Sequence, residues 1–175
     1  GQAYIQLGKY KEAIADFEQV IKINPSDYVA YANFANVYNS MKKYDKAMEC
    51  VNKSLSLKPN NFNALYSRSA IYFNLKEYKK VINDCTEALK IQPDNVELNY
   101  NRGMAYLELG EEVNAKKDIM IYVKKHPDSL HAYLGMAKYY ECNKDKKKAI
   151  FYYDKALKRL ESSKDVFGYN PSDYD

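Results

Sequence analysis

Residues 62–95 read FNALYSRSAIYFNLKEYKKVINDCTEALKIQPDN, which is two amphipathic runs that meet at a polar break and end in a proline turn. The same unit recurs at a fixed interval, because Pro25, Pro59, Pro93 and Pro127 are each 34 residues apart. A period of this length is typical of stacked helix–turn–helix units, none of which can bury its apolar face alone. The sequence therefore predicts an all-α chain of stacked antiparallel helix pairs.

The prolines divide the chain into repeats when each is given position 32 of its unit. Residues 1–27 form a partial first repeat, and residues 28–61, 62–95 and 96–129 form three complete ones. A fifth repeat is expected over residues 130–163, with an extended second helix because no proline interrupts it. Residues 164–175 are either an acidic tail or the entry to a further repeat, since Asn170–Tyr174 duplicates Asn24–Tyr28 letter for letter.

Certain side chains recur at fixed positions of the repeat. The residue at position 8 is small, and we expect two helices to cross there and to leave no room for a larger side chain. The residues at this position are Ala35, Ser69, Gly103 and Ala137. Position 20 is Ala or Val for a similar reason. The polar residues that follow each proline favour the N-cap of the next helix. These N-cap candidates include Asp27, Asn61, Asn95 and Ser129.

Composition narrows the class of protein. The 27 basic and 23 acidic residues alternate as on solvated helices, which argues against a nucleic-acid partner. No run approaches the roughly 18 apolar residues of a membrane span. The odd count of three cysteines, Cys50, Cys85 and Cys142, lacks a disulfide pattern and favours free thiols and a cytoplasmic location.

No catalytic or cofactor-binding constellation stands out in the sequence. His126 and His131 are the only histidines, and with Cys142 they match no known metal-ligand spacing. No Ser/His/Asp order and no glycine-rich phosphate loop is present. We therefore predict a protein that is not an enzyme and that holds no metal and no cofactor.

The in-register prolines, the recurring tyrosine at position 11 and the small residues at positions 8 and 20 resemble the tetratricopeptide repeat family. The resemblance covers residues 1–160. It implies a right-handed superhelical solenoid in which the first helices line a concave groove, and that groove commonly holds an extended or helical peptide. The family implies no catalysis of its own.

Repeats three and four also resemble the co-chaperone subset of this family, in which lysine and arginine side chains grip a terminal carboxylate. Aligned on Asn101, the clamp positions hold Tyr66, Ala70, His131 and Gly135. The cations are missing, and we do not predict that clamp.

Positions that face the groove in the family carry amides and aromatic rings here. Amides can pair with the backbone of an extended peptide, and aromatic rings supply contact area that dominates binding hot spots. We predict a mostly uncharged peptide with apolar anchors; the alternative is that these side chains pack against neighbouring helices. The predicted peptide-binding residues are Asn33, Asn36, Asn63, Tyr66, Phe73, Tyr100, Asn101, Met104 and Leu107.

Arg68 and Arg102 recur at position 7, near the contact between the two helices of a pair. A charge in that place needs a partner, so we expect both to be structural and to pair with an acid or with helix-end carbonyls.

The sequence thus predicts an interaction scaffold that binds a peptide or helix of a partner protein in a groove. One alternative is a regulatory or targeting segment of a larger, possibly enzymatic protein. A second is self-association through the ends of the solenoid, where terminal repeats leave apolar surface exposed.

Overall fold

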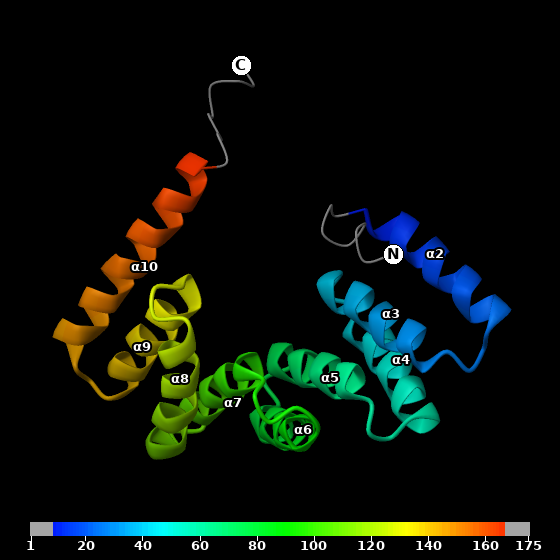
Figure 1. Ribbon diagram of the computed structural model, residues 1–175, viewed down its shortest axis with the longest axis horizontal. Coiled ribbons are helices and arrows are strands. Elements are labelled where there is room, and N and C mark those ends of the chain that lie inside the picture. The colour runs from blue at the N-terminus through cyan, green and yellow to red at the C-terminus, as the bar shows by residue number, and fades with distance from the viewer. Residues whose placement is uncertain (1–8, 167–175) are drawn as a thin grey trace. The chain divides into compact units, whose positions relative to one another are not determined.

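The computed structural model describes residues 9–166, and every regular element within them is a helix (Figure 1). This confirms the all-α fold class. The chain divides into two compact units, Gly1–Leu98 and Asn99–Asp175, with the division inside α7. The helices are α2 (Tyr10–Ile23), α3 (Tyr28–Ser40), α4 (Tyr44–Leu57), α5 (Phe62–Asn74), α6 (Tyr78–Ile91), α7 (Val96–Glu108), α8 (Glu112–Lys125), α9 (Leu130–Cys142) and α10 (Lys146–Val166).

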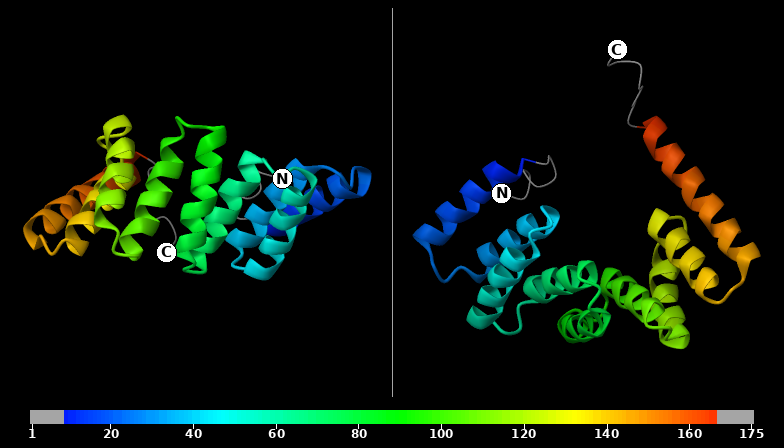
Figure 2. Two further views of the ribbon diagram at one scale, coloured as in Figure 1. Left: turned by 90° about the horizontal axis from the view of Figure 1, so that it is seen from below. Right: turned by 180° about the vertical axis from the view of Figure 1, so that it is seen from behind.

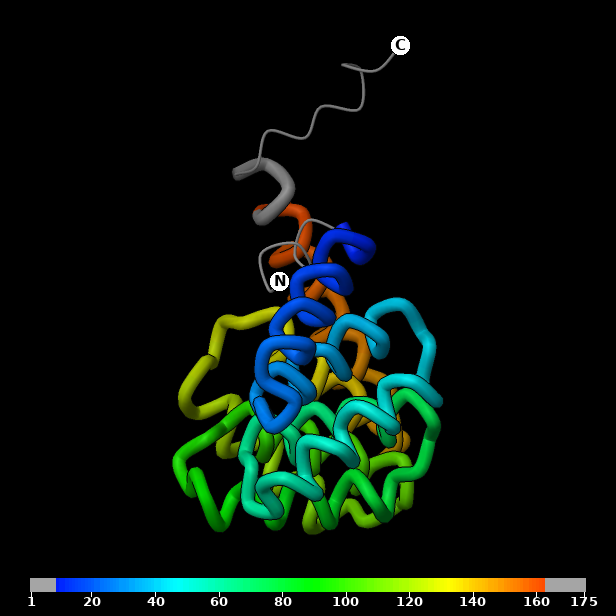
Figure 3. Tube along the Cα trace, turned by 90° about the vertical axis from the view of Figure 1, so that its right-hand side faces the viewer, coloured from blue at the N-terminus to red at the C-terminus, as the bar shows by residue number. Residues whose placement is uncertain are grey.

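Successive helices form antiparallel hairpins. In the first unit α3 packs on α4 and α5 packs on α6, and in the second unit α9 packs on α10 (Figure 2). The Cα trace reverses at a short turn in each hairpin (Figure 3). In the four repeats that begin at residue 28 or later, position 15 lies in this turn and adopts left-handed backbone, with φ of 58° at Lys42, 59° at Lys76, 74° at Gly110 and 59° at Lys144. Only Gly110 is free of the steric cost that a side chain brings to this conformation.

Small residues lie where the helices of a pair cross, as predicted. Ala35, Ser69 and Ala137 are buried at position 8. A Cβ atom added to Gly103 would lie 2.9 Å from Cγ1 of Ile119 on α8, closer than side chains tolerate. The residue at position 20 is buried in the second helix of each repeat; these residues are Ala13, Ala47, Val81, Ala115 and Ala149.

The predicted N-caps are present. Oδ1 of Asp27 accepts hydrogen bonds from the backbone N–H groups of Val29 and Ala30, both at 3.0 Å. The equivalent bonds reach Asn61 from the N–H of Asn63, Asn95 from the N–H of Leu98, and Ser129 from the N–H of Ala132. The first helix of each complete repeat therefore begins at the residue that the sequence indicated.

Two arginine–aspartate pairs tie the helices of a hairpin together. Arg68 on α5 donates through Nε and Nη2 to the carboxylate of Asp84 on α6, at 2.8 Å each. Arg102 on α7 binds Asp118 on α8 in the same bidentate manner, at 2.7 and 3.0 Å. The hydrogen bond to Asp84 raises the pKa of Arg68. The structural role expected for both arginines is confirmed.

A buried polar relay connects successive hairpins in the first unit. The Ser54 hydroxyl on α4 donates to the carbonyl oxygen of Tyr28 at 2.6 Å. The Asn61 side-chain amide donates in turn to the Ser54 hydroxyl at 2.9 Å, and its oxygen caps α5. The start of α3, the last turn of α4 and the start of α5 are thus joined by directional bonds.

The last helix differs in length from the other second helices. α10 has 21 residues, whereas α4, α6 and α8 have 14 each. The Asn170–Tyr174 duplication and most of the predicted tail lie outside the described residues. In the described part of the chain, no helix combines the length and apolarity that crossing a bilayer requires.

Candidate peptide-binding site

A hollow of about 330 Å³ opens in the first unit, between α3 and α5 and beside the start of α7. Four of the predicted peptide-binding residues line it together: Asn33 and Asn36 from α3, and Asn63 and Tyr66 from α5. These residues are brought together because first helices of neighbouring repeats stack side by side. Phe62, Ser67, Asn95 and Glu97 complete the lining.

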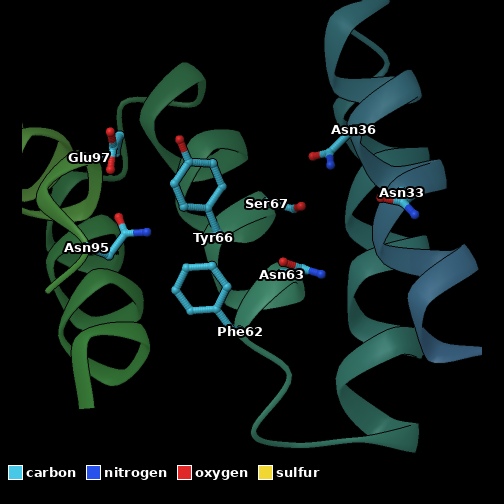
Figure 4. Close-up of a pocket in the computed structure, with 8 residues that line it drawn as sticks. All are labelled: Asn33, Asn36, Phe62, Asn63, Tyr66, Ser67, Asn95 and Glu97. Carbon is cyan, nitrogen blue, oxygen red and sulfur yellow. The ribbon is translucent and has the colours of Figure 1, made fainter. Parts of the chain in front are cut away.

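The hollow has an amide side and an aromatic side (Figure 4). Asn63 and Ser67 point from α5 toward α3, where Asn36 points back toward α5. Phe62 and Tyr66 lie on the opposite side of α5, facing the start of α7, and their rings stack at 6.2 Å between centroids. Hydrogen-bonding groups and an apolar shelf are therefore separated across one helix.

Farther along the same two helices, the amides bind each other. Nδ2 of Asn74 at the end of α5 donates to Oδ1 of Asn39 on α3 at 2.9 Å. This bond bridges α3 and α5 at the end away from Phe62, so the polar surface that lines the hollow is limited to the earlier turns of α5.

Phe73 does not join the hollow. Its ring lies edge-on to Tyr78, at 5.5 Å between centroids, and Tyr78 begins the second helix of the same hairpin. Phe73 therefore follows the alternative given in the sequence analysis, in which a predicted groove residue packs against a neighbouring helix.

Tyr100 packs within the second unit. Its ring lies 4.9 Å from Tyr122 on α8 and 5.7 Å from His131 on α9, between centroids. A Cβ atom added to Gly135 would lie 2.8 Å from Cε2 of Tyr100, so glycine there makes room for the ring. Burial raises the pKa of Tyr100 to about 12.

The last three predicted residues lie near Tyr100 in sequence. Leu107 is 4% exposed and belongs to a core cluster with Ala115, Ile119 and Met136, so it offers no surface to a partner. Met104 packs against the same cluster, and Asn101 is half-buried. We correct the prediction for Leu107: position 12 is filled by the core in this repeat.

The candidate site includes residues that sequence reasoning did not select. Ser67 occupies position 6, the position of Asn33 and Asn101, so the repeat register could have identified it. Phe62 and Asn95 lie at the junction between repeats, where the sequence suggested only caps and turns. Glu97 at position 2 is the one acidic side chain among the lining residues.

Four models of the tetratricopeptide repeat match residues 4–71, 62–95, 85–117 and 130–159, which together span most of the chain. The chain belongs to the tetratricopeptide repeat family. Members of this family are protein-interaction scaffolds, and a protein partner is therefore the expected ligand class. No curated protein matches the sequence of this tetratricopeptide repeat chain.

Solved structures of other tetratricopeptide-type proteins share the fold. PilW, a widely conserved type IV pilus biogenesis factor, matches with a TM-score of 0.82 and 22% identity, over 91% of this chain and 74% of PilW. MamA from Desulfovibrio magneticus RS-1 matches with a TM-score of 0.77 and 19% identity, over 92% of this chain and 91% of the MamA chain. A tetratricopeptide repeat protein from Parabacteroides merdae matches with a TM-score of 0.73 and 20% identity, over 91% of this chain and 64% of the Parabacteroides chain. At these identities the likeness concerns the fold alone.

The described part of the chain holds three free thiols and no cluster of metal ligands. Among residues 9–166 no three His, Cys, Asp or Glu side chains gather as metal ligands would. Cys85 is buried in the core, as predicted, and all three cysteines are free thiols. Burial raises the pKa of Cys50 to about 11, so its reactive thiolate form is scarce at neutral pH.

Proposed function

We propose that the first unit binds an extended, mostly uncharged segment of a partner protein in the hollow between α3 and α5. The observation that carries this proposal is the convergence of Asn33, Asn36, Asn63 and Tyr66 on one hollow. Two of these residues come from one repeat and two from the next. The volume of about 330 Å³ suits one or two side chains of a peptide, at the lower end of ligand-sized pockets.

The amide side of the hollow would bind the peptide backbone. A side-chain amide offers both a donor and an acceptor, which match the carbonyl and N–H groups of an extended chain. Asn33, Asn36 and Asn63 present such groups from two adjacent helices. Contacts to backbone hold a segment in register without reading its side chains.

The aromatic side would bind an apolar anchor of the same segment. The Phe62–Tyr66 pair forms a stacked shelf, and aromatic rings dominate hot spots at small interfaces. Glu97 is the one charged lining residue, so acidic residues in the segment would be repelled and a basic residue tolerated. The expected ligand is therefore neutral or weakly basic with an aliphatic or aromatic anchor.

The test selects peptides from a random 12-residue library displayed on phage, with the full chain immobilised, and measures the best peptide by calorimetry. We expect the selected peptides to share an apolar anchor and to be depleted in Asp and Glu. Tyr66→Ala should weaken the binding of the best peptide by at least about tenfold, the loss typical of a hot spot.

Tyr100→Ala is the matched control, because Tyr100 occupies the same repeat position but packs inside the second unit. This variant should lower the melting temperature and leave peptide affinity within about twofold. If Tyr66→Ala binds as tightly as the wild type while its stability falls, the hollow is not the site.

The two alternatives from the sequence carry different tests. A regulatory segment of a larger protein would use the same hollow, and the sequence of the whole gene would reveal the remainder. Self-association is a second candidate function, favoured by the exposed apolar side chains Ile150 and Leu157 on α10.

A further inference from the structure

One face of α10 carries an apolar stripe. Ile150 is 62% exposed, Leu157 is 57% exposed and Leu160 is 40% exposed, and the half-buried Tyr153 lies between them in sequence. The four residues follow the spacing i, i+3, i+7, i+10, which places them on one side of a helix. This spacing is that of the seam through which two helices pack in a coiled coil. We call these four residues the α10 stripe.

The corresponding face of earlier second helices is covered by a helix. Ile150 and Leu157 occupy positions 21 and 28 of their repeat. On α2 these positions hold Ile14 and Ile21, which are partly buried against a cluster that includes Phe34 of α3. On α4 they hold Met48 and Leu55, which are partly buried against a cluster that includes Ile71 of α5. Within the described residues the α10 stripe keeps the same apolar character with high exposure.

The charges beside the α10 stripe alternate in sign. At 100° per residue, Lys147, Asp154, Lys158 and Glu161 all lie along one flank of the stripe. Several other basic groups of α10 are engaged elsewhere. Lys148 binds Asp145 at 3.1 Å, Lys155 lies over the Tyr133 ring, and Nε of Arg159 donates to the carbonyl oxygen of Asp128.

This charge order is self-complementary about a two-fold axis near Lys155. In an antiparallel pair of α10 helices, Ile150 would meet Leu160 of the second copy, and Tyr153 would meet Leu157. Lys147 would then lie beside Glu161 of the second copy, and Asp154 would lie between Lys158 of the second copy and the symmetry-equivalent Asp154 near the axis. The four opposite-charge contacts outnumber this one like-charge contact. In a parallel pair this charged flank would instead face the opposite flank of the second helix, which holds the buried Ala149 and Ala156, so these charge pairs would not form.

We propose that α10 packs antiparallel against α10 of a second copy of this chain, forming a symmetric dimer. The interface is isologous, so each apolar and each charged contact occurs twice. The proposal specifies the self-association named above, and it does not depend on peptide binding by the first unit. Two heptads bury a small area, so we expect a weak dimer at the low end of interface sizes.

The experiment is a concentration series of the full chain by analytical ultracentrifugation, from roughly 10 µM to 1 mM, the range in which so small an interface would assemble. The average mass should rise from 20.4 kDa toward twice that value. Ile150→Ser combined with Leu157→Ser should abolish the rise. Val113→Ser is the matched control, because Val113 is 85% exposed on α8 and lies outside the stripe.

A charge exchange tests the antiparallel register. Glu161→Lys should weaken dimerisation at least about fivefold, and adding Lys147→Glu should restore it, because the two residues exchange places across the two-fold axis. Circular dichroism checks that every variant keeps its helical content.

A mass of 20.4 kDa throughout the series would overturn the proposal. So would a dimer that survives the double serine variant, or a charge exchange without recovery. The library-selected peptide should bind wild type and double serine variant alike, so failure of either proposal is seen separately.

Discussion

The Arg68–Asp84 pair offers a direct test of how the hairpins are held together. Asp84 has a side chain only 2% exposed, whereas that of Arg68 is 23% exposed. Arg68→Ala leaves a buried carboxylate without its bidentate donor. Asp84→Ala leaves a guanidinium that can still reach water and that lies 5.9 Å from the centre of the Tyr72 ring. The two single variants should therefore lower the free energy of unfolding by different amounts.

The expected magnitudes follow from this asymmetry. Removing one partner of a buried ion pair typically destabilises a protein by about 3–5 kcal/mol. We expect about 3 kcal/mol for Arg68→Ala, because nearby water can reach the site through the exposed quarter of the arginine. We expect about 1–2 kcal/mol for Asp84→Ala. The double change Arg68→Met with Asp84→Leu should cost less than Arg68→Ala, since an apolar pair leaves no buried charge.

Urea unfolding followed by circular dichroism measures these differences, and an alanine double-mutant cycle isolates the coupling between the two side chains. The Arg102–Asp118 pair supplies an internal replicate in the second unit. A coupling energy below about 0.5 kcal/mol in both pairs would show that the bidentate bonds contribute nothing to stability, and the reasoning would fail.

Three further predictions concern single positions. Lys76→Gly should raise the free energy of unfolding by about 1 kcal/mol, and Gly110→Ala should lower it by a similar amount, because both residues have positive φ; urea unfolding measures both. Asp27→Ala removes the two bonds at the start of α3 and should cost about 1 kcal/mol by the same assay. The phenol of Tyr100 should titrate near its raised pKa of about 12, in a spectrophotometric titration at 295 nm compared with Tyr100→Phe. Because this folded-state pKa lies above the unfolded value, the stability that the neutral phenol contributes is complete below about pH 10 and lost as pH rises toward 12; Tyr100→Phe should lack that loss.

The repeat period made most of the fold predictable. A spacing of 34 residues fixes which positions are small, which cap a helix and which face a neighbour, and these assignments depend on local geometry. The N-cap at Asp27 and the close approach at Gly103 both followed from that register. The pairing partners of Arg68 and Arg102 were foreseen as a class, but the identity of the aspartates depends on how α5 and α7 cross their hairpin partners.

The site was less predictable because repeat position does not determine which neighbours a side chain packs against. Tyr66 and Tyr100 share position 5, yet Tyr66 lines the hollow and Tyr100 is packed against Tyr122. Tyr122 occupies position 27, where the preceding repeat has the small Ala88. The packing of a groove residue thus depends on the bulk of a side chain on the second helix of its own repeat, which the residue at position 5 read alone does not reveal.

The relay from Tyr28 through Ser54 to Asn61 has a consequence for recognition. Hydrocarbon surfaces can slide over one another with little change in energy, whereas a chain of hydrogen bonds holds its members at set angles. The distance between α3 and α5, and with it the separation of Asn36 from Asn63, is thereby set before any ligand arrives. A peptide would therefore bind a site whose geometry is already fixed. Most of the conformational entropy lost on association would be that of the peptide.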